Sequence, residues 1–332
     1  MRQETSDLHK PMKHSISIAP MMDWTDRHCR YFLRLVSPHA LLYTEMVTAA
    51  ALKHGDAGRL LRFNEEEHPV ALQLGGGDPE LMAEAARLGA AEGYDEFNIN
   101  VGCPSDRVQS GQFGACLMAE PERIAACVRA MRSAAAVPVT VKTRIGIDDR
   151  DSYGFLCAFV ETVAEAGCRS FILHARKALL DGLSPKENRS VPPLDYERVY
   201  RLKREYPELT VTLNGGVAGI EQVIEHLRHV DGVMIGREAY QNPWLLTELE
   251  RAVYGVENVP DRQEVLAAMG RYIERELRDG VALKQITRHL LGLFNGQPGA
   301  KAWRRYLSEH SQRPGAGIEV VHAALERLSR AA

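Results

Sequence analysis

Short apolar runs recur along the chain, and each is followed by a turn and then by a stretch in which apolar residues have helical spacing. This alternation predicts a parallel sheet built from strand and helix units. The runs are almost continuously apolar, as expected for strands that are covered on both faces. The eight runs lie at residues 15–21, 41–46, 69–76, 96–103, 138–146, 170–176, 210–216 and 232–238.

Start and stop signals delimit the helices between these runs. Asp78-Pro79 predicts an N-cap and a first helical turn, and Gly93 follows the end of that helix. Other helices are predicted to begin at Pro121 and at Asn242-Pro243, the latter ending near Gly255. The apolar faces predicted for the first two helices are Leu81, Ala85 and Leu88, and Ile124, Val128 and Met131. Eight such units fit a closed (β/α)8 TIM barrel of about 250 residues, and an open doubly wound sheet is the alternative.

The pattern changes after Pro260. Asp261 with Glu264 three residues later predicts a capping box, and no strand-like run follows as far as the C-terminus. Val265, Met269, Tyr272 and Leu277 recur at helical spacing, and further helical patterns cover 281–294, 299–310 and 317–329. We therefore predict a barrel domain over residues 12–258 and an all-helical domain over 259–332.

Composition narrows the class of protein. At 332 residues and 45% hydrophobic content, the chain can bury a large core. The net charge of −3 means that a polyanionic partner must be met by a local basic patch. The polar N-terminal stretch and the lack of any window near ~18 apolar residues predict a cytoplasmic protein without a membrane span. Six cysteines without CxxC pairs predict reduced thiols, no disulfide framework and no metal site.

Candidate chemistry collects where the predicted strands end, which is where a barrel of this kind places its active site. Glycines end the last two strands at Gly215-Gly216 and at Gly236, followed by Arg237, and such turns bind phosphate in many barrels. They could also simply reverse the chain. The spacing in Gly75-Gly76-Gly77-Asp78 is not that of a dinucleotide fingerprint, so a Rossmann domain is not expected.

Other polar residues at strand ends have two interpretations each. Lys142 ends an apolar run, which suggests an anionic partner such as a reduced flavin or a ribityl phosphate, or else a lysine that extends its ammonium to solvent. His174 alone is more typical of a structural histidine. Gln73 and Asn98 could bind the edge of a heterocycle or satisfy loop backbone.

Cys103 differs from the other cysteines in its position. It lies in the turn Gly102-Cys103-Pro104-Ser105 directly after a predicted strand, where a thiol can act as nucleophile or proton donor. The remaining cysteines fall in helical or helix-end patterns that favour small buried hydrophobic residues, namely Cys29, Cys116, Cys127, Cys157 and Cys168.

Taken together, these motifs resemble the flavin-dependent tRNA-dihydrouridine synthases, and most closely their bacterial A-type subgroup, which acts on D-loop uridines 20 and 20a. The resemblance runs in order from about Ser15 to the C-terminal helices. It rests on APMMDWTDRHCR (19–30), QLGG (73–76), NINVGCPS (98–105), VKTRIG (141–146), HARKALLDGLSPKENR (174–189), NGG (214–216) and IGRE (235–238).

The resemblance implies a role for each motif. Cys103 is expected to be the active-site acid, protonating C5 of uracil while a flavin reduced by NADPH delivers hydride to C6. The residues expected to bind FMN are Ala19, Pro20, Met21, Met22, Gln73, Lys142, His174, Asn214, Gly215, Gly216, Gly236 and Arg237. Those expected to contact the uridine or the tRNA are Asn98, Asn100, Arg144, Arg176, Lys186, Arg189, Lys301, Arg304 and Arg305.

Local charge agrees with an RNA partner. From Lys284 to Tyr306 the chain contains five basic residues and no Asp or Glu, and KAWRRY places an aromatic ring among the charges. Any one of these residues could equally belong to a solvated helix face. We expect a monomer. Two other functions stay open on the residues alone: a barrel flavin reductase acting on a free pyrimidine such as orotate or uracil, and a non-catalytic RNA-binding protein.

Overall fold

The computed structural model describes residues 15–105, 111 and 113–330. By packing, the chain divides into two compact units. One contains Met1–Met22 and Ala40–Gly236, and the other contains Asp23–His39 and Arg237–Ala332. We call them the barrel unit and the helical unit. Residues 12–14 and 331–332, at the two ends of the predicted domains, lie outside the described residues.

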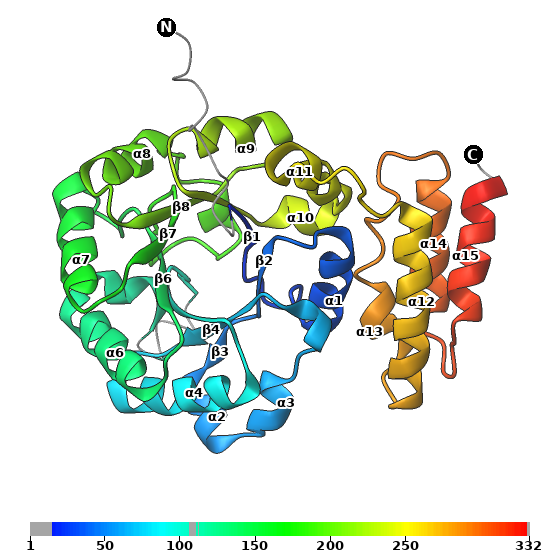
Figure 1. The fold of residues 1–332 in the computed structure, drawn as a ribbon, viewed down its shortest axis with the longest axis horizontal. Helices are drawn as coiled ribbons and strands as arrows, with labels where there is room; N and C mark the ends of the chain where they lie inside the picture. The colour runs from blue at the N-terminus through cyan, green and yellow to red at the C-terminus, as the bar shows by residue number, and fades with distance from the viewer. Residues whose placement is uncertain (1–14, 106–110, 112, 331–332) are drawn as a thin grey trace, which may run out of the picture. The chain divides into compact units, whose positions relative to one another are not determined.

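The barrel unit contains a closed sheet of eight parallel strands (Figure 1). Closure follows from the pairing of β2 with both β1 and β4, while β1 also pairs with β9. The strands are β1 (Ile16–Ile18), β2 (Leu41–Tyr43), β4 (Val70–Gly75), β5 (Glu96–Val101), β6 (Val139–Arg144), β7 (Ser170–His174), β8 (Thr210–Asn214) and β9 (Gly232–Ile235). Each of the eight predicted runs contains one of these strands, so the TIM barrel is confirmed and the open sheet is excluded.

A ninth, two-residue strand, β3 (Val47–Thr48), was not predicted. It pairs with Leu74 and Gly75 at the C-terminal end of β4. The helices of the barrel unit lie outside its sheet in Figure 1. Those of the barrel unit are α2 (Ala49–His54), α3 (Ala57–Leu61), α4 (Pro79–Glu92), α6 (Pro121–Ala134), α7 (Tyr153–Glu165), α8 (Tyr196–Glu205) and α9 (Ile220–Leu227), with short 3-10 turns η1 (Glu65–Glu67), η2 (Gly114–Ala119) and η3 (Glu187–Arg189).

Helix α4 shows how the local signals work and where one prediction is wrong. The Asp78 carboxylate accepts from the Leu81 amide, and Gly93 ends the helix in the left-handed region. The buried face is rotated from the predicted one, so Leu81 and Leu88 are only half-buried. The cause is Gly89, where an added Cβ would lie 2.7 Å from the Phe97 ring, so that this helix approaches the sheet through small residues.

The helical unit combines α1 (Arg27–Val36), α10 (Arg237–Gln241) and α11 (Trp244–Tyr254) with α12 (Arg262–Arg278), α13 (Leu283–Thr287), α14 (Ala300–His310) and α15 (Glu319–Arg330). The capping box at Asp261 and Glu264 is confirmed in both directions. Leu277 is half-buried, and the buried position beside it is Glu276, which pairs with Arg27.

The helix predicted over 281–294 is too long, because α13 ends at Thr287 and turns follow. Side chains bind the carbonyl groups of these turns: the indole of Trp303 donates to the Leu290 carbonyl at 3.0 Å, and Arg262 donates to that of Leu293 at 2.9 Å. Among the described residues, no helix is both long and apolar enough to cross a bilayer.

Candidate active site in the barrel

Strand β5 alternates between the two faces of the barrel wall. Phe97, Ile99 and Val101 are fully buried, and between them Asn98 and Asn100 bond to side chains of neighbouring strands. This period of two is the geometry of any strand, so the polar residues of β5 share the interior face. Inside a closed barrel, polar groups must satisfy one another because little water reaches them.

They do so through a continuous series of hydrogen bonds. Thr140 donates to Glu96 Oε1 at 2.7 Å, and Asn98 Nδ2 donates to Thr140 Oγ1 at 2.9 Å. Gln73 Nε2 then donates to Asn98 Oδ1, and Asn100 Nδ2 donates to Gln73 Oε1, both at 2.8 Å. We call Glu96, Thr140, Asn98, Gln73 and Asn100 the interior polar chain.

The interior polar chain ends at the turn that carries Cys103. Asn100 Oδ1 accepts from the backbone N–H groups of Gly102 at 3.1 Å and Cys103 at 3.0 Å. The Cys103 carbonyl accepts from Ala115, and its sulfur lies 3.5 Å from the Ser105 hydroxyl. The thiol is therefore held just beyond the end of β5 and remains partly accessible.

Positive charge accumulates at the same strand ends. Burial lowers the pKa of Lys142 to about 7; Arg144 acts in the same direction and Cys103 opposes it. Burial also lowers the pKa of His174 well below its ordinary value, with Arg144, Lys142, Arg176 and Arg189 adding to the effect. Clustered cations next to an imidazole that is neutral at neutral pH are suited to an anionic or electron-rich ligand.

Two glycines follow β8 with left-handed backbones, at φ 114° for Gly215 and 73° for Gly216. A Cβ on Gly215 would lie 2.6 Å from the His174 ring, and one on Gly216 would lie 2.7 Å from the Tyr196 hydroxyl. Only glycine fits both the conformation and the space. Asn214 precedes them and donates to the Met234 carbonyl at 2.8 Å.

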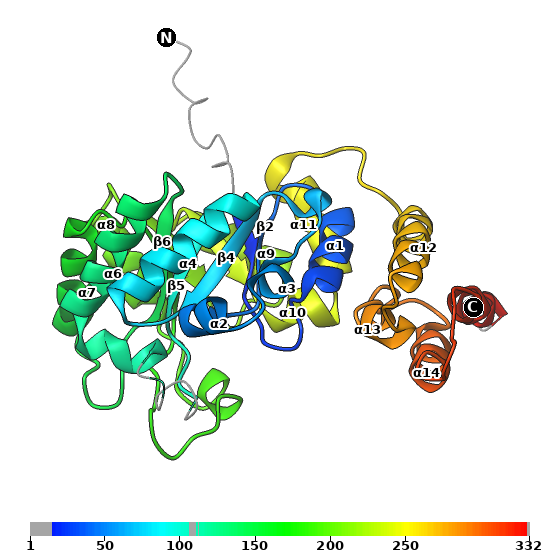
Figure 2. The same cartoon turned by 90° about the horizontal axis from the view of Figure 1, so that it is seen from below.

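Arg144 joins the Cys103 turn to the long segment between β7 and α8, which extends beyond one end of the barrel in Figure 2. The Arg144 guanidinium donates to the Gly102 carbonyl at 3.1 Å, to Lys177 at 3.2 Å and to Asn188 at 2.9 Å. Its pKa is lowered to about 10 by burial, so it remains a cation at neutral pH. Asn188 itself is buried and bonds to backbone groups of Leu179 and Leu183 within the same segment.

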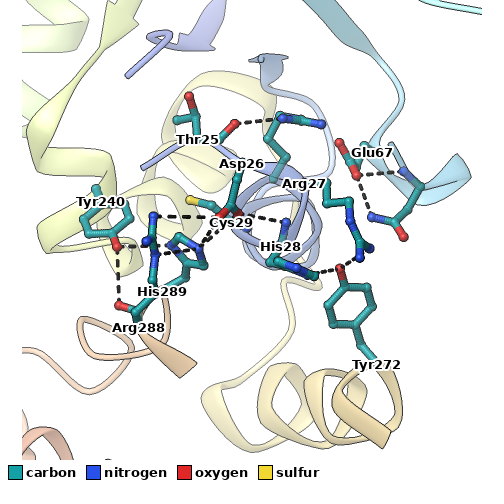
Figure 3. Close-up of polar contacts among 12 residues, drawn as sticks. Thr25, Asp26, Arg27, His28, Cys29, Glu67, Tyr240, Tyr272, Arg288 and His289 are labelled. Carbon is teal, nitrogen blue, oxygen red and sulfur yellow. Dashed lines mark hydrogen bonds and ion pairs between the residues drawn. The ribbon is translucent and has the colours of Figure 1, made fainter. Parts of the chain in front are cut away.

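The helical unit has its own polar network, centred on Asp26 (Figure 3). The Asp26 carboxylate caps α1 by accepting from the His28 and Cys29 amides, and it also lies 3.0 Å from His289 Nε2. Burial opposes ionisation of Asp26, yet the hydrogen bond and charge of His289 leave its pKa below the ordinary value. Tyr240 completes the network, 3.1 Å from His289 Nδ1.

Beside this network lies a cavity of about 570 Å³ whose lining includes Trp24, Tyr240, Arg288 and Arg304. The rings of Trp24 and Tyr240 stack with centroids 4.4 Å apart. Aromatic surface with adjacent guanidinium groups is the composition that binds single-stranded nucleic acid.

A TIM barrel with a thiol, a cationic cluster and a glycine turn at its strand ends has the features of a barrel enzyme whose active site lies at that end. The chain belongs to the dihydrouridine synthase (Dus) family, whose profile matches residues 17–329. It is 60% identical over 321 residues to the tRNA-dihydrouridine(20/20a) synthase of Vibrio cholerae, covering 96% of this chain and 98% of that protein. The protein of the same name from Salmonella typhi is 59% identical over 331 residues, which cover 99% of each chain. The one from Escherichia coli K12 is 59% identical over 328 residues, which cover 98% of this chain and 94% of that protein.

The structure brings together many of the predicted site residues at one end of the barrel unit. Ala19 is buried, Pro20 and Met21 are half-buried, and Met22 is exposed. Gln73 and Asn98 are almost fully buried, with their amides bonded on both sides. Arg176 donates to backbone carbonyls of Ser190 and Pro192 within the β7–α8 segment.

The remaining predicted residues lie on surfaces. Lys186 and Arg189 are exposed in the β7–α8 segment of the barrel unit. Lys301, Arg304 and Arg305 are exposed on α14 of the helical unit, where Arg305 pairs with Glu309 at 2.8 Å. Gly236 follows β9, and Arg237 begins α10 with an exposed side chain.

Sequence reasoning assigned no role to Glu96, Thr140, Asn188 or Asp26. For Glu96 a signal was present, because Glu96, Asn98 and Asn100 are spaced by two on one strand and must share a face. The pairing of Thr140 with Asn98 depends on the register between β5 and β6, which no local pattern gives.

We predict that Arg144→Lys loosens the β7–α8 segment. Lysine keeps the charge but lacks the planar fork that binds three carbonyls at once. Limited trypsin digestion should cleave after Lys177, Lys186 and Arg189 faster than in the wild type. Arg132→Lys is the matched control, since Arg132 also donates to a backbone carbonyl, that of Gly167, outside this segment. Equal cleavage rates in both variants would contradict the assignment.

Proposed function

We propose that this enzyme reduces the C5–C6 double bond of uridines 20 and 20a in the tRNA D-loop to dihydrouridine, with FMN as cofactor and NADPH as reductant. Enzymes of this family are flavin-dependent in general. The observation that carries the proposal is the Cys103 turn, held by Asn100 beside the cationic cluster at the strand ends. Because its substrate is tRNA, we propose that the enzyme acts in the cytoplasm.

The residues present fit FMN. Gly215 and Gly216 keep the turn after β8 in a left-handed conformation that other residues rarely adopt, and backbone N–H groups of such turns suit a phosphate. We propose that Asn214 and Gly236 contribute to the same phosphate site. Burial and the cation of Arg144 lower the pKa of Lys142, and the thiol of Cys103 opposes them. A bound anion would therefore stabilise the charged form of Lys142.

When bound, the flavin supplies the hydride for C6 of uracil. Cys103 supplies the proton for C5 from its S–H group, which becomes a thiolate that must be reprotonated before the next turnover. Lys142 offsets negative charge beside it, and His174, neutral at neutral pH, can hold a carbonyl or a ring nitrogen by a hydrogen bond. Since Asn98 is fully buried, we propose that it positions Gln73 and Asn100 without touching the tRNA.

The target uridine must leave the base stack, which costs a few kcal/mol. Phosphate contacts elsewhere offset this cost. We propose Lys186 and Arg189 in the barrel unit, and Lys301, Arg304 and Arg305 in the helical unit, as these contacts. The pair between Arg305 and Glu309 is exposed and screened by solvent, so it leaves Arg305 able to exchange partners.

The direct test is nucleoside analysis of tRNA that lacks dihydrouridine, after incubation with the enzyme, FMN and NADPH. Mass spectrometry should detect dihydrouridine and map it to positions 20 and 20a. NADPH consumption with free uracil or orotate, and no product in tRNA, would instead support a reductase of free pyrimidines.

Removal of the thiol should separate the two half-reactions. In Cys103→Ala, uridine reduction should fall by roughly 10² to 10⁴, the usual contribution of a placed general acid. The rate of flavin reduction by NADPH, measured as the loss of flavin absorbance, should be unchanged. Cys157→Ala, at a half-buried thiol on α7, is the control and should behave like the wild type. If Cys103→Ala still reduced uridine at the wild-type rate, Cys103 would not be the proton donor.

FMN affinity should depend on pH through Lys142. In the flavin-free protein its pKa is about 7, and a neighbouring anion raises that pKa, so binding takes up a proton. FMN affinity should therefore weaken as pH rises above 7, by up to about tenfold per pH unit. Titration by quenching of FMN fluorescence measures this.

The controls use two lysine variants. Lys142→Met should bind FMN more weakly at pH 7 and lose the pH dependence. Lys203→Met removes a lysine paired with Asp231 elsewhere in the barrel unit and should keep it. A wild-type affinity that stays flat from pH 7 to 9 would refute the assignment to Lys142.

A further inference from the structure

The hydrogen bonds of the interior polar chain all run in the same sense, from donor to acceptor toward Glu96. This sense is set at Glu96, the end of the chain farthest from the thiol. An ionised carboxylate can only accept hydrogen bonds. Glu96 Oε1 accepts from Thr140 at 2.7 Å and from the phenol of Tyr43 at 2.6 Å. Burial and the neighbouring Glu96 raise the pKa of Tyr43 well above its ordinary value, so the phenol keeps the proton that it donates.

Each following link then has only one arrangement. The Thr140 hydroxyl reaches Glu96 Oε1 at 2.7 Å and, more weakly, the Phe97 carbonyl at 3.4 Å. Both are acceptors for its single proton, so its oxygen is left to accept from Asn98, which has to present its NH₂ group. The Asn98 carbonyl therefore faces Gln73, and the Gln73 carbonyl faces Asn100. Asn100 in turn must direct its NH₂ group at Gln73 and its carbonyl away from it.

At the other end, the Asn100 carbonyl meets two groups that can only donate, the backbone N–H groups of Gly102 and Cys103. A flipped Asn100 amide would place donors against donors and lose both bonds to the turn. The acceptor at Glu96 and the donors at the turn thus favour the same orientation of all three amides.

We propose that Glu96 and Thr140 are positioning residues for Cys103, acting through Asn98, Gln73 and Asn100 to fix the turn that carries the thiol. Neither residue lies at the thiol. Glu96 is the first residue of β5, and Thr140 lies on β6, where it pairs with Asn98 of β5. The inference rests on the proposed function for its activity readout. Burial raises the pKa of Glu96 above its ordinary value, and the hydrogen bonds that Tyr43 and Thr140 donate to Oε1 oppose this rise.

The test compares two substitutions of one residue. Thr140→Val keeps the shape and removes the hydroxyl, whereas Thr140→Ser keeps the hydroxyl and removes a methyl group. Displacement of a reacting group by about 1 Å can cost 10²-fold in rate, so Thr140→Val should slow uridine reduction by about tenfold or more. Thr140→Ser should stay close to the wild type, and flavin content and flavin reduction by NADPH should be unchanged in both.

Thr143→Val is the matched control. Thr143 is also buried on β6, but its hydroxyl donates to the Val101 backbone carbonyl and takes no part in the interior polar chain. Its loss should leave uridine reduction unchanged. A second pair tests the other residue: Glu96→Gln retains an acceptor oxygen and should keep most activity, whereas Glu96→Met has none and should lose it as Thr140→Val does.

A second readout does not need catalysis. The rate at which iodoacetamide alkylates Cys103 in flavin-free protein, followed by mass spectrometry of its peptide, should rise severalfold in Thr140→Val and Glu96→Met only. If Thr140→Ser were impaired as much as Thr140→Val, packing would explain the effect and the proposal would fail. The proposal would also fail if Thr140→Val reduced uridine and was alkylated at Cys103 at the wild-type rates. It would fail as well if Thr140→Val slowed flavin reduction and uridine reduction equally.

Two pairs keep the test decisive. Should Thr140→Val not fold, the comparison of Glu96→Gln with Glu96→Met still tests the same chain of hydrogen bonds. If the wild type formed no dihydrouridine in tRNA, the proposed function would fail, but the alkylation rates would still decide whether the interior polar chain fixes the turn.

Discussion

The rest of the structure depends on the closure of a parallel sheet whose side chains alternate between two environments. Outward residues such as Phe97 and Phe171 are fully buried under the helices, where each contributes about 1.5 to 3 kcal/mol by burial. Inward residues enter a space that the sheet itself encloses. A polar group there costs free energy unless it is bonded, so β4, β5 and β6 can carry Gln73, Asn98 and Thr140 only as a connected set.

Electrostatics at the strand ends follow from the same enclosure. Lys142, Arg144 and His174 succeed one another around β6 and β7, in a place where burial weakens solvation. Arg144 remains charged and directs its donors at three backbone carbonyls, so it stabilises loops while it also depresses the pKa of its neighbours. Lys142 has a pKa near 7, which leaves its charge dependent on what binds beside it. A site of this kind is best stabilised by an anion.

The barrel was predictable because its signals are local. Continuous apolar runs, Asp78 and Asp261 as caps, and Gly93 and Gly255 after helix ends each act within a few residues, and the structure confirms them. The position of Cys103 after β5 was predictable for the same reason.

What the sequence did not yield depends on contacts between distant segments. The role of Thr140 needs the register of β6 against β5, and the packing of α1 with the C-terminal helices depends on Asp26 meeting His289, 263 residues away. The rotated face of α4 depends on how closely Gly89 lets the helix approach Phe97. Such facts follow from packing, since no periodicity records which strand or helix a side chain will meet.

The barrel interior is divided between two kinds of surface. Strands β4 to β6 contribute amides, a hydroxyl and cations, while Ala19, Tyr43, Ala71, Ile172 and Met234 form an apolar cluster against which Met21 packs. A flat heterocycle with polar edges and apolar faces needs both, because its edges must find donors and acceptors while its faces exclude water. The amides of the interior polar chain are already bonded to one another, so their orientation is set before any ligand arrives. Preorganised dipoles lose little on binding, so an interior built from fixed amides holds the Cys103 turn in one orientation.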